Sequence, residues 1–470
     1  MNFSLLFVHF TWVTVAIAIL FPNAASAATP PKAQNSSSSV QVPDRLNPSP
    51  NALQFPTKPE EVRIQGTVPI SLAQALELAK RNNRDLQVAI LQLERSRSAL
   101  RESQAGLFPT LGINSSVTNS GNGFRNNSSQ ASTSFNGSAQ LNYNLYTSGN
   151  TLATIRAAEE QLRIDELNVE SQSLIIRLNA TTQYYDLQQA DEQVRINRSA
   201  VQNAQASLRD TQAREQAGVG TRFDVLQAQV NLANAQQLLT NAISQQQIAR
   251  RQLATLLSLS QSSEISASDP VQLAGLWQQT VEQSIVQAFQ NRPELQQQLA
   301  QRNISEQQRR QALSQLGPQV SLAGNYNLLD RYDDGVSITD GYSVGLQGNL
   351  TVFDGGAARA RAAQSRANIA IAETQFANQR DLIRFDVEQY YAQLQSNLNN
   401  VQTSSVALNQ AREALNLARL RFQAGVGTQT EVIDAENDLT RAEGNRVAAI
   451  LDYNRALANL QRSVTSRASR

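Results

Sequence analysis

The sequence has 470 residues and a net charge of +1, and 17% of its residues are charged, against roughly 25% in an average globular protein. This near-neutral balance gives no support for nucleic-acid binding. There is no cysteine, which excludes disulfides, cysteine-ligated metals and a lipid-anchored cysteine. The only histidine, His9, lies in an N-terminal apolar run, so a mature chain lacks the groups of Ser-His-Asp or Cys-His catalysis. We expect no enzyme, no cofactor and no metal.

The first 27 residues have the pattern of a secretory signal peptide. The run from Ser4 to Phe21 is almost wholly apolar, and Ala25-Ser26-Ala27 is a small-x-small cleavage site. The segment before this run carries no Lys or Arg, so an uncleaved N-terminal anchor is the alternative, although the small-residue site favours cleavage. Residues 28–66 are rich in Pro, Ser, Asn and Gln, which predicts a flexible linker without a core.

An internal repeat is the strongest signal in the sequence. The hexapeptide Gln216–Thr221 (QAGVGT) recurs 207 residues later as Gln423–Thr428 (QAGVGT). Other short segments recur at nearly the same offset, namely Tyr184-Tyr185 as Tyr390-Tyr391 and Asn82–Leu86 as Asn291–Leu295. The chain is therefore predicted to hold two copies of one design, at residues 67–270 and 271–463, followed by a tail at 464–470.

Each copy contains one long segment with neither proline nor glycine, at about residues 150–217 and 357–424. At 1.5 Å per residue, such a helix is on the order of 100 Å long. The apolar positions step by seven, which is typical of helices that supercoil around neighbours. The longest column is formed by Val387, Leu394, Val401, Leu408, Leu415 and Phe422. Small polar residues between the columns indicate a helix with neighbours on two sides.

Shorter helices complete each copy, and they are predicted at residues 71–107, 222–258, 281–315 and 429–462. The two Gly-Val-Gly-Thr motifs lie where a long helix reverses into a shorter one. Glycine accepts the positive φ of a helix C-terminal cap. The threonines that follow, Thr221 and Thr428, are placed to cap the returning helices.

A period of two replaces the helical pattern between the first short helix and the long helix of each copy. It predicts strands at about 110–118, 133–147, 318–329 and 341–353. Each strand has about 10 residues, enough to cross a bilayer at barrel tilt. Four strands cannot close a membrane barrel, which needs about eight, so closure requires several chains.

The order of short helix, hairpin, long helix, glycine-rich reversal and returning helix, found twice over residues 67–463, resembles the TolC family of outer-membrane efflux proteins. The matching motifs are Asn291–Leu295 (NRPEL), Leu350–Gly356 (LTVFDGG) and Ala424–Thr428 (AGVGT) followed by Val432–Ala435 (VIDA). The first-copy strand exit, Leu145–Gly149, lacks the acidic residue of its counterpart. The resemblance implies a mainly α fold with a transmembrane β portion, a long helical barrel joined to a trimeric twelve-stranded β-barrel.

What this resemblance implies for function is an exit duct in the cell outer membrane, with its helical tunnel in the periplasm. Such a duct serves a tripartite efflux or type I secretion system and passes drugs, metabolites or polypeptides. The implied partners are two further copies in a homotrimer, a periplasmic adaptor (membrane fusion) protein, an inner-membrane transporter of the ABC, RND or MFS type, and outer-membrane lipid.

The same resemblance assigns candidate site residues. The adaptor-docking tip would comprise Gly218, Gly220, Thr221, Gly425, Gly427 and Thr428. Asp434, with Asp224 as a looser counterpart, matches an acidic residue that rings the pore constriction in the family. The alternative for both is a solvated aspartate favoured by the dipole near a helix start.

Two other classes of envelope protein share some of these features. A trimeric coiled-coil adhesin-type protein without transport activity would explain the heptads and the secretion signal, but it would not place hairpins inside each repeat. A periplasmic adaptor carries one helical hairpin between compact β domains, whereas this chain has two helix-dominated copies.

Overall fold

The computed structural model describes residues 46–47, 51, 53–64, 66–121, 131–260, 262–332 and 337–464, all within one compact unit that spans Gln41–Arg470. The expected signal peptide at residues 1–27 lies outside the described residues. So do most of the expected tail and the residues between β2 and β3.

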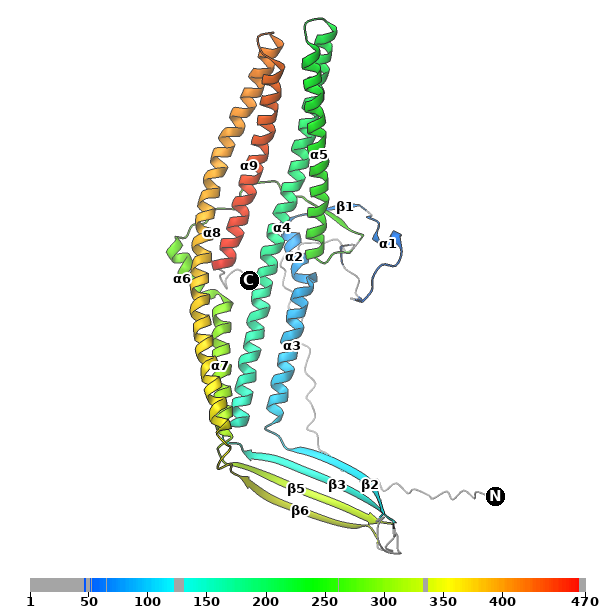
Figure 1. Ribbon diagram of the computed structural model, residues 1–470, viewed down its shortest axis with the longest axis vertical. Coiled ribbons are helices and arrows are strands. Elements are labelled where there is room, and N and C mark those ends of the chain that lie inside the picture. Colours follow the sequence, from blue (N-terminus) through cyan, green and yellow to red (C-terminus); the bar gives the residue numbers. More distant parts are fainter. Residues whose placement is uncertain are drawn as a thin grey trace, which may run out of the picture. The chain divides into compact units, whose positions relative to one another are not determined.

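Two helices of 67 residues each dominate the fold, α4 (Asn150–Gln216) and α8 (Ala357–Gln423), and they confirm the two long helices expected from the sequence (Figure 1). The absence of internal Gly and Pro allows this length, which is on the order of 100 Å. Val387, Leu394, Leu408 and Leu415 of the heptad column are buried on α8. Among the described residues, no helix has both the length and the apolar character needed to cross a membrane.

The returning helices pack along the long ones. Helix α5 (Arg222–Leu256) lies on α4, and α9 (Gln429–Val464) lies on α8 (Figure 1). Helix α9 also contacts α4, and α7 (Pro293–Ser314) contacts both α4 and α8. The two copies therefore share one helical body.

The first short helix of copy one is broken, which corrects the prediction of a single helix over 71–107. Helix α2 (Leu72–Asn82) ends at Asn83, and α3 (Arg84–Ala105) begins directly after it. The Asn83 backbone is extended, and its side chain accepts hydrogen bonds from the amides of Asp85 and Leu86, so it caps α3. The asparagine caps a new helix instead of continuing the old one.

Copy two is broken at the equivalent place, between α6 (Val281–Asn291) and α7. Here Arg292 is extended, because the following Pro293 disfavours helical backbone at the preceding residue. The prediction of a single helix over 281–315 is wrong for this reason.

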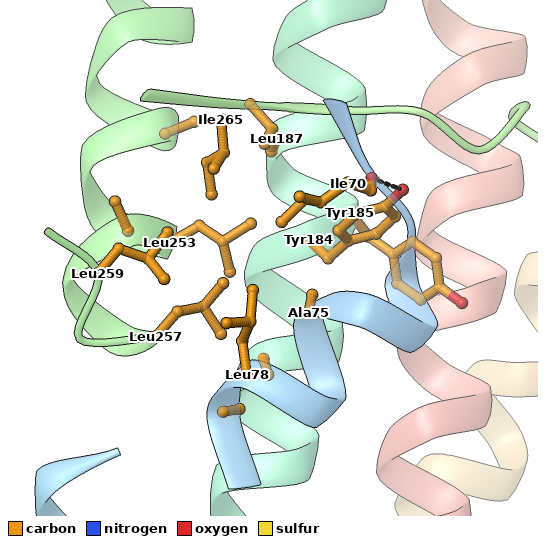
Figure 2. Packing of buried hydrophobic residues seen from close by; sticks show 14 of the residues in the cluster. Ile70, Ala75, Leu78, Tyr184, Tyr185, Leu187, Leu253, Leu257, Leu259 and Ile265 are labelled. Atoms are coloured by element: carbon orange, nitrogen blue, oxygen red, sulfur yellow. Dashed lines mark hydrogen bonds between the residues drawn. The ribbon is translucent and has the colours of Figure 1, made fainter. Parts of the chain in front are cut away.

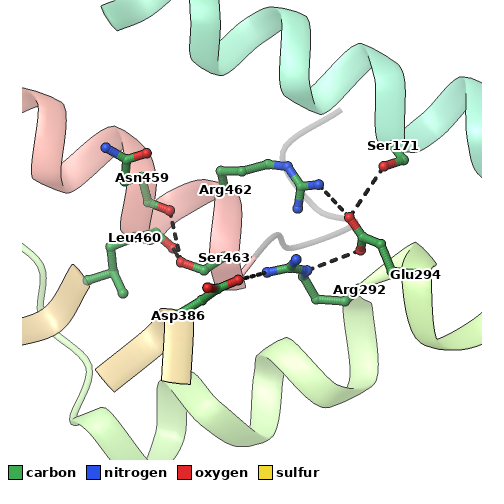
Figure 3. Close-up of polar contacts among 8 residues, drawn as sticks. All are labelled: Ser171, Arg292, Glu294, Asp386, Asn459, Leu460, Arg462 and Ser463. Atoms are coloured by element: carbon green, nitrogen blue, oxygen red, sulfur yellow. Dashed lines mark hydrogen bonds and ion pairs between the residues drawn. The ribbon is translucent and has the colours of Figure 1, made fainter. Parts of the chain in front are cut away.

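The break in copy two carries a buried network of charges (Figure 3). Glu294 accepts from Arg292 Nε at 3.1 Å, from Ser171 Oγ at 3.3 Å and from Arg462 near the end of α9. Arg292 also meets Asp386 of α8 at 3.4 Å. Burial opposes ionisation of Glu294, but Arg292 and Arg462 outweigh it and hold the pKa of this carboxyl below its usual value. The network joins α4, α7, α8 and α9.

A hydrophobic cluster beside α4 surrounds Tyr184 (Figure 2). The Tyr184 hydroxyl donates to the carbonyl of Ile70 at 3.0 Å and to Asp269 Oδ2 at 2.9 Å. Ile70 ends β1 (Thr67–Ile70), which pairs in parallel with β4 (Glu264–Ala267). The tyrosine that marks the repeat is thus a core residue, and its hydroxyl is satisfied in the interior.

This core extends into the segment expected to be a flexible linker. Leu46 is fully buried in the cluster, and its carbonyl accepts from the Ser260 amide at 3.4 Å. The short helix α1 (Pro59–Val62) follows, with no buried residue. One apolar side chain in a polar stretch does not change the composition noticeably, so this contact could not be predicted from the sequence.

A four-stranded antiparallel sheet has the order β2-β3-β5-β6, and its strands span Thr110–Gly121, Ala131–Tyr146, Gln319–Arg331 and Thr339–Asn349. Strands β3 and β5 pair directly, so the hairpins of the two copies are continuous. Strand β6 stops at Asn349 and not near residue 353, because its partner there, Gln319, is the first residue of β5. Strands β2 and β6 are unpaired edges within this chain.

Gly317→Ala is expected to destabilise the junction between sheet and helices by about 1–3 kcal/mol, the usual cost of overpacking. A Cβ on Gly317 would approach Ser148 Cβ to 2.5 Å and its hydroxyl more closely. Ser148 cannot easily retreat, since it has a φ of 52° and donates to the Pro318 carbonyl at 2.6 Å. The temperature at which the expected oligomer dissociates on heating should fall. The control Gly345→Ala meets no atom within 4 Å, and an equal fall there would contradict this account.

Candidate functional site

The two reversals between long and returning helices, here called the tips, have the same backbone geometry. Gly218 and Gly425 have φ angles of 75° and 77°, as the sequence predicts for a helix C-terminal cap. At the first tip, the amides of Gly218 and Val219 donate to the carbonyls of Glu215 and Arg214, both at 3.0 Å. This pair of bonds is a Schellman motif, and the second tip repeats it.

The second glycine of each motif is required for a different reason. A Cβ on Gly220 would lie 3.0 Å from the Glu215 amide nitrogen. A Cβ on Gly427 would lie 3.0 Å from the backbone of Arg421 and Phe422. The loop therefore packs closely against the last helical turn, and a side chain at either position would force the backbone to shift, which the sequence alone did not reveal.

The threonines cap the returning helices as expected. The Thr221 hydroxyl accepts from the Asp224 amide at 3.2 Å, and the Asp224 carboxylate accepts from the Thr221 amide at 3.2 Å, which completes a capping box. Thr428 accepts from the Glu431 amide at 3.2 Å in the same way. Asp224 thus has a local structural role.

Asp224 and Asp434, the two candidate residues of the pore constriction, lie in different surroundings. At the 207-residue offset, Asp224 corresponds to Glu431, which pairs with Arg421 at 3.4 Å. Asp434 corresponds to Gln227, whose amide donates to Thr430 at 3.1 Å. Asp434 itself is exposed and has no hydrogen bond or ion pair within the part of the chain that the structure describes.

The two tips are joined by Arg214, a residue that the sequence analysis did not single out. Its guanidinium lies 4.2 Å from the centre of the Phe422 ring and donates to the Phe422 carbonyl at 2.7 Å. The positive charge therefore stabilises the C-terminal end of α8 through its dipole and the ring through a cation–π contact. A cavity of about 250 Å³ beside this contact is lined by both tips. Tip one and tip two form one surface.

That surface presents apolar side chains to solvent. Val219 and Val426, between the glycines of each motif, are 73% and 70% exposed, and Phe223 on the first turn of α5 is 70% exposed. The two tips therefore expose apolar side chains at matching positions of the repeat.

Comparison with known proteins relates both copies to one family. The model for the outer membrane efflux protein family matches residues 75–258 and 284–465. The chain is 24% identical to outer membrane protein OprJ of Pseudomonas aeruginosa, over 83% of this chain and 84% of that protein. It is 25% identical to the pyoverdine export outer membrane protein OpmQ of Pseudomonas putida, over 88% of this chain and 90% of that protein.

The fold agrees with a solved outer membrane protein. The crystal structure of VceC from Vibrio cholerae superposes with a TM-score of 0.71 at 19% identity, covering 84% of this chain and 95% of that one. The family match spans the long helices, both tips and the sheet, in the same order in each copy. The chain belongs to the outer membrane efflux protein family.

Proposed function

We propose that this chain forms the outer-membrane exit duct of a tripartite efflux or type I secretion system. The observation that carries the proposal is the family match over both copies of a helix–hairpin body whose sheet has two open edges. Membership of this family places the protein in the outer membrane with the helices in the periplasm, among channels that are not enzymes. The cargo would be drugs, metabolites or polypeptides delivered by an inner-membrane transporter of the ABC, RND or MFS type.

Closure by further copies follows from surfaces left uncovered in one chain. The edges β2 and β6 expose unpaired backbone groups, which lipid does not tolerate. Three chains of four strands supply a barrel of twelve. Helix α8 also exposes a second apolar column at multiples of seven residues, formed by Ile371, Phe385, Val406 and Leu420. Helix α5 exposes Phe223, Leu226, Val230 and Leu238 near the tip, and we assign this face to Val406 and Leu420, the part of the α8 column at the same height, across the subunit boundary.

The tips are the proposed docking surface for a periplasmic adaptor. Gly218, Gly220 and Thr221 shape one reversal, and their counterparts Gly425, Gly427 and Thr428 shape the other. The exposed valines within the two motifs supply apolar contact area, which a helical hairpin of a partner can cover.

Envelope fractionation combined with a gel of heated and unheated protein tests the proposal. The expected product is an outer-membrane species that migrates as an oligomer unheated and as a single chain after boiling. Purified oligomer should also insert into a planar bilayer in discrete conductance steps. A monomer in the periplasmic fraction would refute the duct. An outer-membrane oligomer without conductance would instead favour the adhesin-type alternative, which no comparison supports.

Asp434→Ala is expected to weaken block of that conductance by divalent cations about tenfold, since three exposed carboxylates around one axis concentrate cations. The measurement is the blocking concentration in single-channel recordings. Asp438→Ala is the control, because Asp438 lies one turn further along α9 and is paired with Arg441 at 3.4 Å. Equal effects of the two substitutions would reject Asp434 as the constriction.

A further inference from the structure

A cavity of about 270 Å³ lies between α4, α8 and α9, on the helix side of the tips. Its polar lining comes from both copies: Asn203, Ser207 and Asp210 from α4, Arg419 and Gln423 from α8, and Gln429 and Glu436 from α9. A water molecule takes up about 30 Å³, so the cavity has room for several waters or for a small hydrated ion.

Two buried oxygen atoms in this cavity have no hydrogen-bond donor among the residues that the structure describes. Glu436 is 6% exposed, and its Oε1 accepts from Arg419 at 2.9 Å, but its Oε2 has no partner. Gln429 is 2% exposed, and its amide nitrogen donates to Ser207 Oγ at 2.7 Å, but its Oε1 has no partner. A buried acceptor without a donor costs about 1–3 kcal/mol, so an unfilled cavity would be unfavourable at both atoms.

The charge of the lining favours a cation over an anion. Glu436 and Asp210 contribute two carboxylates against one guanidinium, that of Arg419, whose side chain is 41% exposed and therefore partly screened by solvent. Burial raises the pKa of Glu436, Arg419 opposes this effect and Asp210 adds to it. A positive ion in the cavity would favour the ionised carboxylate.

The internal repeat does not account for this cluster. At the 207-residue offset, Glu436 corresponds to Gln229, Arg419 to Gln212 and Asp210 to Leu417. Copy one thus has no carboxylate where copy two buries one. The repeat therefore does not explain why Glu436 is buried in copy two, and the cause must lie in the surroundings of Glu436 itself.

We propose that this cavity binds a hydrated divalent cation of the Mg²⁺ class through Glu436 Oε2 and Gln429 Oε1, with Asp210 at its rim. Mg²⁺ keeps several waters and is commonly held by one or two carboxylates. No cluster of three or more carboxylate, histidine or cysteine ligands occurs in the described ranges, so water would have to supply most of the ligands of the ion. The bound ion would tie α4 of copy one to α9 of copy two.

A titration with Mn²⁺, followed by the electron paramagnetic resonance of the free ion, tests the site. All proteins carry Asp434→Asn, so that the proposed pore ring does not contribute. The background protein is expected to bind one Mn²⁺ per chain, and affinity should fall as the pH is lowered because protons compete for the carboxylate. Glu436→Gln, which keeps the size of the side chain, should weaken binding about tenfold or more.

Two further variants make the outcome decisive. Gln429→Glu adds a carboxylate and should tighten Mn²⁺ binding, whereas Asp438→Asn removes an exposed carboxylate of the same helix and should leave it unchanged. Oligomer bands of unheated protein confirm that each variant is assembled. Absence of saturable binding, or binding that survives Glu436→Gln, would overturn the site. Either result would leave the proposed export function untouched, since the cavity lies within one chain.

Discussion

Glu294→Ala is expected to destabilise the assembled protein by about 3–5 kcal/mol, the usual cost of breaking a buried ion pair from one side. The Glu294 side chain is only 19% exposed, and it supplies the carboxylate that Arg292 and Arg462 share. Its loss leaves the desolvation cost of the arginines without its main compensation. The contact between the end of α9 and the start of α7, here called the joint, should open first.

The matched control is Glu373→Ala, which removes an exposed partner of Arg302 in an ion pair between α7 and α8. Those side chains are 59% and 42% exposed, so the expected loss is at most about 1 kcal/mol. The measurement is the temperature at which the oligomer dissociates on heating at neutral pH. Indistinguishable temperatures for the two variants would show that the network does not stabilise the joint.

The pH dependence of the same network has a definite sign. The pKa of Glu294 is lowered on folding, so its contribution is complete above the unfolded value of about 4.3 and is lost as the pH falls through the folded value. The wild-type protein should therefore exceed Glu294→Gln in stability at neutral pH and lose that advantage under acid conditions. A stability difference that stays constant down to low pH would contradict ionisation as its source.

Gly427→Ala is expected to weaken adaptor binding about 5- to 150-fold and to reduce export, while the oligomer stays assembled. The added Cβ would lie 3.0 Å from the backbone of Arg421 and Phe422, and these atoms cannot rotate away. The reversal must open at a cost of about 1–3 kcal/mol, which also disturbs the Arg214–Phe422 contact between the tips.

Gly444→Ala, on the helix α9 that follows the tip, is a control with the opposite expected effect on stability. Its Cβ would meet only Gln193 Oε1 at an ordinary 3.7 Å, and alanine stabilises a helix interior by about 1 kcal/mol relative to glycine. Both variants are assayed by co-purification of the adaptor and by export from intact cells. Normal adaptor binding by Gly427→Ala would remove the tips from the docking surface.

Local sequence patterns predicted the order of the helices, reversals and strands along this chain well. Helices α4 and α8 follow from stretches free of Gly and Pro. The tips follow from the first glycine of each motif, which adopts the positive φ of a helix C-terminal cap. The break at Asn83 was missed, because an asparagine that caps a new helix looks like one on a helix surface. The pairing of β1 with β4 was missed because each has only four residues.

The site was less predictable, because its decisive contacts join residues far apart in sequence. Nothing near Arg214 indicates that it reaches Phe422, and burial of Glu436 depends on α4 of the other copy. Asp224 bonds to Thr221 within its own tip, whereas Glu431 at the matching position of the repeat pairs with Arg421. Tertiary neighbours, rather than local pattern, decide the role of a polar side chain.

Native mass spectrometry of the complex extracted from outer membranes tests the central claim most directly. Four strands with two open edges cannot close a barrel alone, and the family resemblance implies three chains, so the account predicts a particle with the mass of three chains. A particle with the mass of one chain, stable in detergent and in the membrane, would contradict it.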